Sequence, residues 1–202
     1  MSSAYEYRRL SPEERERVVQ QRRERGYPRH APPHPFRHAG HYFITAVNYE
    51  HANIMATPER RTEFEDHLLS HLAEIGAELG AWVILPNHYH VEVGVASLDD
   101  ISHVLQHVHG STARAWNLAD GCTGRRRVWY KFQDRVIRDE AHFHRAINYI
   151  HYNPVKHGYV DSPYDWPWAS LETYESNYGR DWLREQWKRY TPSDDAQEWH
   201  EP

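Results

Sequence analysis

Two histidines separated by a single residue are the first candidates for chemistry in this chain. His88 and His90 follow a Pro-Asn break and begin a run of strand-forming residues. Alternate side chains of a β-strand share a face, so His88, His90 and Glu92 would lie together, opposite Tyr89. Two imidazoles fixed on a sheet can bind a metal ion. The chain holds 17 His, and a solvated polar strand face would give the same pattern. Both interpretations stay open at this point.

A tyrosine near the end of a later helix is the second candidate. Tyr149 and Asn153 are four residues apart, a spacing that places both on one helix face. A tyrosine hydroxyl can act as a covalent nucleophile, and an amide oxygen is a hard metal ligand. The chain has 14 Tyr, and a tyrosine before a helix end is more commonly a packing residue.

A basic segment interleaved with aromatic residues is the third candidate. Arginines beside aromatic rings suit phosphate contacts combined with base stacking in nucleic-acid binding. A solvated turn that leads into a strand explains the same residues equally well. The candidate nucleic-acid contacts are Arg125, Arg126, Arg127, Lys131, Arg135 and Arg138.

Composition excludes several classes of protein. The 202 residues have a mean hydropathy of -0.92 and include no run near the ~20 apolar residues of a membrane span. The start of the chain lacks the apolar segment of a secretory signal, so we expect a cytoplasmic protein without a membrane partner. The single cysteine, Cys122, excludes an internal disulfide and Cys-pair metal or redox motifs. The sequence has no Gly-rich phosphate loop, and we therefore expect no nucleotide cofactor.

Charge is distributed unevenly along the chain. The net charge of -5 argues against bulk attraction to nucleic acid. Residues 1–40 carry nine Arg against five Glu, whereas residues 161–202 carry four Lys or Arg against ten acids. We therefore predict three parts: an Arg- and Pro-rich arm (1–39), a catalytic domain (40–160) and an acidic, Trp-rich tail (161–202).

The elements that must position these candidates follow from residue periodicity. Aromatic and β-branched runs predict strands, and apolar residues at helical spacing predict helices. Gly80 is expected to end the first helix of the domain, and Pro154 the last. The order β-α-β-β-α-β-α predicts an α+β fold, a mostly antiparallel sheet with helices on one face, like the split βαβ unit. The expected ranges are 42–47, 58–79, 82–85, 88–95, 97–120, 127–137 and 140–153.

Several short motifs, taken together and in order, resemble the REP-associated tyrosine transposases, a branch of the single-tyrosine HUH transposases. The resemblance covers about residues 40–175. The motifs are His41-Tyr42-Phe43-Ile44-Thr45, Leu85-Pro86-Asn87-His88-Tyr89-His90, Val128-Trp129-Tyr130, Asp134-Arg135-Val136-Ile137-Arg138-Asp139-Glu140, Tyr149-Ile150-His151-Tyr152-Asn153-Pro154-Val155-Lys156-His157-Gly158 and Asp165-Trp166-Pro167-Trp168-Ala169-Ser170.

This resemblance implies a ferredoxin-like HUH domain that cleaves and rejoins single-stranded DNA. It implies that His88 and His90 hold a divalent metal, Mg²⁺ or Mn²⁺, with Asn153 as the third ligand. Tyr149 matches the nucleophile, which would form a 5′-phosphotyrosine. The implied substrate is single-stranded DNA beside a hairpin of a repeated palindrome. The resemblance favours a monomer and leaves a dimer open.

Two other functions are compatible with the same residues. A domesticated protein could hold DNA or RNA hairpins without cutting them, because binding does not require Tyr149. A His-dependent phosphohydrolase could use the pair His88 and His90 for attack by water, and it would form no covalent adduct.

Overall fold

The computed structural model of the chain describes residues 11, 13, 17, 39–124 and 126–191. Contacts divide the chain into two units, Arg37–Asp195 and a second made of Met1–Phe36 with Ala196–Pro202. The expected arm falls outside the described residues except for four positions, and so do residues 192–202 of the expected tail. The three-part division of the chain therefore stays a prediction.

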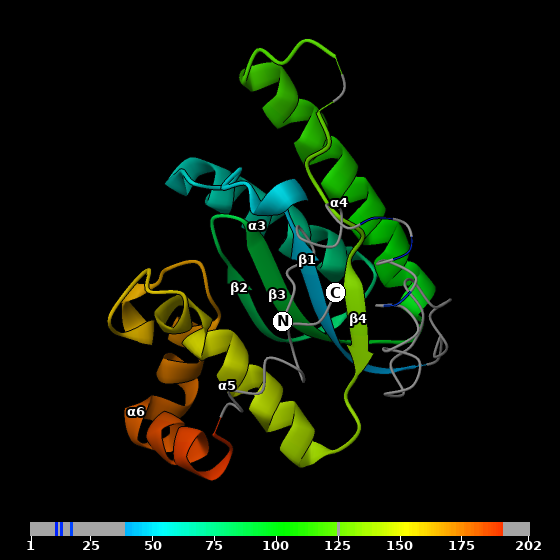
Figure 1. The fold of residues 1–202 in the computed structure, drawn as a ribbon. Coiled ribbons are helices and arrows are strands. Elements are labelled where there is room, and N and C mark those ends of the chain that lie inside the picture. Colours follow the sequence, from blue (N-terminus) through cyan, green and yellow to red (C-terminus); the bar gives the residue numbers. More distant parts are fainter. Residues whose placement is uncertain (1–10, 12, 14–16, 18–38, 125, 192–202) are drawn as a thin grey trace. The chain divides into compact units, whose positions relative to one another are not determined.

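A four-stranded antiparallel sheet forms the centre of the described unit (Figure 1). Its strands lie in the order β2-β3-β1-β4, and each neighbouring pair is antiparallel. Along the chain the order is β1-α3-β2-β3-α4-β4, the repeated split βαβ unit of a ferredoxin-like fold. The predicted α+β class is confirmed. The strands are β1 (Gly40–Val47), β2 (Glu78–Ile84), β3 (His88–Val95) and β4 (Gln133–Val136).

Helices cover both faces of this sheet, so the prediction that they share one face is wrong. Helices α3 (Pro58–Glu74) and α4 (Leu98–Ala119) pack on the face that carries Ile44, in one apolar core. Helix α5 (Glu140–Lys156) lies on the opposite face, where Phe43 contacts Tyr149 (Figure 1). Phe43 and Ile44 are 1% and 0% exposed. Because these neighbours point to opposite faces, β1 requires apolar cover on each side.

Local chemistry fixes where the first helix of the domain begins and ends. The Thr57 hydroxyl accepts a hydrogen bond from the Arg60 N–H, and Pro58 occupies the first helical position. The helix ends at Glu74 rather than near Gly80, because the chain turns at Gly76 with a φ of 68°. Strand β2 therefore begins at Glu78, earlier than the sequence predicts.

Pro154 does not end α5, contrary to the sequence prediction. Proline removes one helical hydrogen bond, but Pro154 lies in the last turn, where a single loss is tolerated. The N–H of His157 bonds the carbonyl of Asn153 at 3.1 Å and closes that turn. As a result Tyr149, Asn153 and His157 follow one another at four-residue spacing along one helix face.

Much of the acidic C-terminal segment is folded. A short 3-10 helix, η2 (Pro163–Asp165), leads into α6 (Leu171–Arg189), which lies beside α5 (Figure 1). The indole N–H of Trp166 donates to the carbonyl of Ile84 at 3.0 Å, and Leu183 is buried. This segment therefore covers the β2 edge of the sheet. None of the helices in the described ranges is long and apolar enough to cross a membrane.

Candidate active site

The strand pairing brings the two histidines beneath α5. In the antiparallel register of β1 and β3, Thr45 lies opposite His90 and Val47 lies opposite His88. Directly opposed residues share a face, here the one covered by α5. The two histidines are 6% and 0% exposed, and Tyr149 and Asn153 on α5 are 2% and 0% exposed. The structure thus gathers the four residues that the sequence singled out.

Hydrogen bonds orient the His88 ring. The side-chain Nδ2 of Asn87 donates to the carbonyl of His51 at 3.3 Å, which leaves the Asn87 Oδ1 directed at His88. This oxygen lies 2.6 Å from Nδ1 of His88, so Nδ1 carries the proton and Nε2 carries the lone pair. Nε2 in turn lies 3.2 Å from Oδ1 of Asn153. Two acceptor atoms therefore face each other across the gap, an arrangement that a cation between them would stabilise.

His90 is held from the opposite side of its ring. Its Nδ1 lies 2.8 Å from the Thr45 hydroxyl in a buried contact. The ring stacks on Phe43 with centroids 5.2 Å apart, and it meets the ring of His88 edge-on at 5.1 Å. Because Thr45 engages Nδ1, Nε2 is the ring atom that would bind a metal.

Tyr149 packs closely against this cluster. Its ring centroid lies 5.5 Å from that of His90, and Nζ of Lys156 lies 4.8 Å from the Tyr149 ring. Burial raises the pKa of the Tyr149 phenol, while a hydrogen bond with Asn153 and the charge of Arg135 act in the opposite direction. The phenol is neutral in this environment, and nearby cations reduce the cost of forming its anion.

The donor set fits a divalent cation. Imidazole nitrogen is a common ligand of transition ions, and amide oxygen suits Mg²⁺ and Mn²⁺. Across residues 39–124 and 126–191, no three His, Cys, Asp or Glu side chains are grouped to hold a metal. A third donor would instead be the amide of Asn153. All three donors are neutral, so a bound cation would keep its full charge for a phosphate.

Glu92, the third polar residue of the β3 pattern, has a separate role. Its carboxylate is fully buried and lies 2.9 Å from Nδ1 of His41. Burial raises the pKa of Glu92 to about 7, and the bond to His41 acts against this rise. Glu92 is thus paired with the start of β1 and does not join the histidine cluster.

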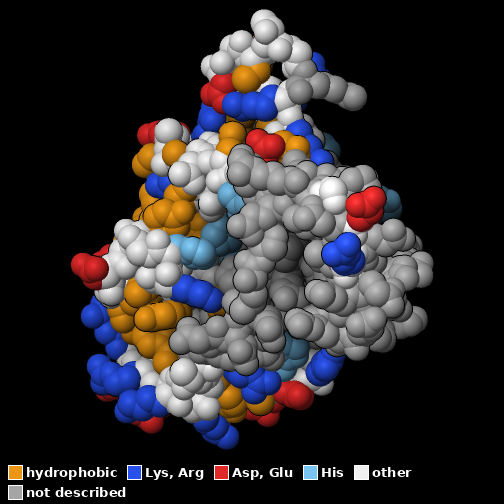
Figure 2. Space-filling model, viewed as in Figure 1, with side chains coloured by type: hydrophobic (Ala, Val, Ile, Leu, Met, Phe, Trp, Pro, Cys, Tyr) orange, Lys and Arg blue, Asp and Glu red, His pale blue; other side chains and the backbone are white. Residues whose placement is uncertain are grey.

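Two residues near the cluster were missed by the sequence reasoning. The ring of His157 lies 4.9 Å from that of His88, edge to face, and Lys156 lies over Tyr149. The sequence held one signal for His157: it follows Asn153 by four residues, the same helical interval that links Tyr149 and Asn153. Histidine and basic side chains reach the surface together on the side of the molecule that carries α5 (Figure 2).

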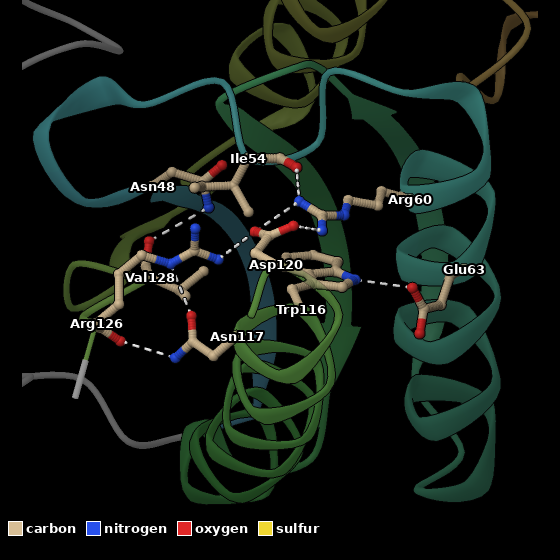
Figure 3. Close-up of polar contacts among 9 residues, drawn as sticks. All are labelled: Asn48, Ile54, Arg60, Glu63, Trp116, Asn117, Asp120, Arg126 and Val128. Carbon is tan, nitrogen blue, oxygen red and sulfur yellow. Dashed lines mark hydrogen bonds and ion pairs between the residues drawn. The ribbon is translucent and has the colours of Figure 1, made fainter. Parts of the chain in front are cut away.

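The basic segment contributes unevenly. Arg126 is engaged within the fold: its Nε donates to Oδ1 of Asn117 and its Nη2 donates to Asp120, both at 2.7 Å (Figure 3). Asp120 also pairs with Arg60, and these two arginines hold the pKa of Asp120 below its usual value. This network ties the segment to the end of α4.

The other basic residues are placed differently. Arg127 lies over the rings of Tyr49 and Tyr130, at 4.9 Å and 5.3 Å from their centroids. Arg135 lies opposite Phe43 in the β1–β4 register, close enough to influence Tyr149. Of the remaining candidates, Lys131 and Arg138 are exposed, and Arg125 falls outside the described residues. Their roles in nucleic-acid binding stay predictions.

Two curated proteins are similar to this chain in sequence. No family model matches the chain. A Haemophilus influenzae protein named "Putative REP-associated tyrosine transposase" is 28% identical over 159 residues, which span 73% of this chain and 89% of that protein. The REP-associated tyrosine transposase of Escherichia coli K12 is 29% identical over 109 residues, or 52% of this chain and 62% of that protein.

A solved structure shares the fold. It is a REP-associated tyrosine transposase bound to a REP hairpin, with a TM-score of 0.58 and 22% identity over 73% of this chain and 87% of its own. The architecture is therefore the ferredoxin-like fold of that class of transposase. The resemblance drawn from the motifs is confirmed: the chain is similar to the REP-associated tyrosine transposases.

Proposed function

We propose that the protein is an enzyme of the tyrosine transposase type, which cleaves and rejoins single-stranded DNA beside a hairpin. The observation that carries the proposal is the convergence of His88, His90, Asn153 and Tyr149 on one face of the sheet. The names of the curated relatives and the REP hairpin bound to the solved relative support the choice of DNA substrate.

Three residues would hold a divalent cation, Mg²⁺ or Mn²⁺: His88, His90 and Asn153. The 3.2 Å separation of Nε2 of His88 and Oδ1 of Asn153 supports this, because both atoms can bind one cation. A bound cation would polarise the scissile phosphate and offset the charge that develops on its oxygens. The protein's own contribution is orientation, because Asn87 and Thr45 fix the two imidazole rings.

Tyr149 would act as the nucleophile. Its hydroxyl oxygen forms a bond to phosphorus, and the bond from phosphorus to the 3′ oxygen breaks. The phenol loses a proton and the departing 3′ oxygen gains one. The product is a 5′-phosphotyrosine with a free 3′-hydroxyl, and attack by that hydroxyl or one of another strand reverses the step. The covalent bond retains the energy of the original linkage, so the reaction requires no nucleotide cofactor.

Access to Tyr149 must be coupled to DNA binding. With 2% of the residue exposed, a phosphate reaches the hydroxyl only if neighbouring side chains move. Lys156 and Arg135 are cations that act on this ring, and both are long, flexible side chains. They are suited to move from the tyrosine to the phosphate as DNA enters.

A covalent-adduct assay tests the proposal. Labelled single-stranded hairpin DNA from the flanks of the gene is incubated with the protein in Mn²⁺ or EDTA and resolved on a denaturing gel. We expect a metal-dependent shifted band that Tyr149→Phe abolishes. The matched control is Tyr152→Phe, an exposed tyrosine on the same helix, which should behave as wild type. Binding without an adduct would favour the hairpin-binding alternative. Cleavage that survives Tyr149→Phe would favour a phosphohydrolase.

A further inference from the structure

A second concave site lies beside the histidine cluster. It is a pocket of about 350 Å³ between the start of β2, the first half of α5 and α6. Its volume falls within the range of sites that take small molecules. Nothing in the proposed cleavage step uses it. The lining residues are His41, Glu78, Leu79, Gly80, Phe143, His144, Ile147, Tyr174, Tyr178 and Trp182.

Aromatic rings form one wall of the pocket. Tyr178 and Trp182 stack with centroids 4.6 Å apart and an interplanar angle of 26°. The chain between them turns at Gly179, whose φ of 81° interrupts α6. The hydroxyl of Tyr174 donates to the carbonyl of Gly80 at 2.9 Å, which fixes this wall to the sheet. Tyr178 is 57% exposed, so a planar aromatic face is available to a ligand.

Hydrogen-bond acceptors form the opposite edge. Nδ1 of His41 lies 2.9 Å from the buried carboxylate of Glu92 and donates to it, and in the neutral ring Nε2 is then an acceptor. That Nε2 lies 3.9 Å from the carboxylate of Glu78. The edge therefore offers a ring nitrogen and an exposed carboxylate to hydrogen-bond donors on a ligand.

Two glycines make this edge possible. A Cβ at Gly80 would lie 1.8 Å from Oε2 of Glu92, and a Cβ at Gly94 would lie 2.8 Å from Cε1 of His41. Both distances are too short for any other residue without displacement. The sheet is thus shaped so that Glu92 can hold the His41 ring against the pocket.

The charge of the described lining disfavours a phosphate as the ligand. Among the described residues, those around the pocket include Glu78 and neither Lys nor Arg. A flat ligand with amino donors fits instead, because it can stack on Tyr178 and donate to His41 and Glu78. We propose that this pocket binds one unpaired, amino-bearing nucleobase (adenine, cytosine or guanine) of a single strand, in preference to thymine.

The position of the pocket agrees with this assignment. His41 and Phe43 are alternate residues of β1 on the face that α5 covers, so they lie about 7 Å apart. Phe43 contacts both His90 and Tyr149. A base in the pocket would therefore belong to a nucleotide close to the bond that Tyr149 is proposed to cleave. In this respect the inference rests on the proposed function.

Binding of two homopolymers tests the pocket. Fluorescence anisotropy measures the affinity of the Tyr149→Phe protein, in EDTA and low salt, for labelled (dC)12 and (dT)12. We expect about tenfold tighter binding of (dC)12, since a well-formed set of base contacts discriminates by about that factor. In the same background Tyr178→Ala should weaken (dC)12 binding about tenfold. Glu78→Ala should remove most of the preference for (dC)12.

Leu118→Ala, which truncates an exposed apolar side chain on α4, is the control and should bind as the Tyr149→Phe parent does. Equal affinity for the two homopolymers, or unchanged (dC)12 binding by Tyr178→Ala, would overturn the inference. The readout is independent of cleavage. A preference for (dC)12, with no covalent adduct formed by the wild-type protein on hairpin DNA in Mn²⁺, would refute the proposed function alone. An adduct of the wild-type protein without the preference for (dC)12 would refute the pocket alone.

Discussion

Replacing Gly80 with alanine should destabilise the protein, although most glycine-to-alanine changes within strands stabilise. The added Cβ would lie 1.8 Å from Oε2 of Glu92. Glu92 cannot move aside easily, because it is fully buried and its other oxygen is bonded to His41. Overpacking of this kind costs about 2–3 kcal/mol. For a domain of this size, that lowers the melting temperature by roughly 4–12 °C.

Urea unfolding followed by circular dichroism measures this effect. Gly110→Ala is the matched control, because Gly110 lies within α4 and a Cβ there meets nothing within 4 Å. That variant should gain about 1 kcal/mol from helix propensity. The double variant Gly80→Ala with Glu92→Ala should lose less stability than the two single changes combined. If Gly80→Ala were as stable as wild type, the close packing of Glu92 against β2 would be refuted.

Three further predictions concern other parts of the molecule. Burial lowers the pKa of His109 to about 3. As the pH drops, His109 therefore binds a proton in the unfolded chain before it does so in the folded protein. The free energy of unfolding should fall as the pH drops from about 6.5 towards 3. In that pH window, His109→Gln should lower by about one the number of protons taken up on unfolding, as measured from the slope of the unfolding free energy against pH. An unchanged slope would contradict this. Thr45→Val should weaken Mn²⁺ binding about 10- to 100-fold in calorimetry, because Thr45 orients His90; equal affinity would argue against this role. Arg135→Gln should slow adduct formation about 100-fold in single-turnover assays and leave Mn²⁺ affinity unchanged; a wild-type rate would exclude Arg135 from the reaction.

Local patterns were sufficient to predict much of the site. Alternation along β3 placed His88 and His90 on one face, and helical spacing placed Tyr149 with Asn153. Both inferences depend only on neighbours within a few residues, which secondary structure controls directly. The α+β class with an antiparallel sheet then followed from the succession of elements.

Long-range contacts account for what the sequence did not indicate. β1 is apolar at consecutive positions, so its pattern does not reveal that α5 covers the face opposite α3 and α4. The pattern also did not reveal that Arg126 bonds Asn117 and Asp120, because these partners belong to a different element. The end of α3 was misplaced because Gly76 and Gly80 are equivalent as sequence signals. Of these two glycines, Gly76 has a positive φ and Gly80 does not. Gly80 instead leaves space for the side chain of Glu92, which is distant in sequence.

The central claim is that Tyr149 forms the covalent bond to DNA. The most direct measurement is mass spectrometry of the protein after reaction with single-stranded hairpin DNA in Mn²⁺, followed by nuclease and protease digestion. We predict a nucleotide-modified peptide from α5 with the added mass on Tyr149, and none in EDTA. A modification on another tyrosine, such as the exposed Tyr152, or cleaved DNA without a modified peptide, would contradict it.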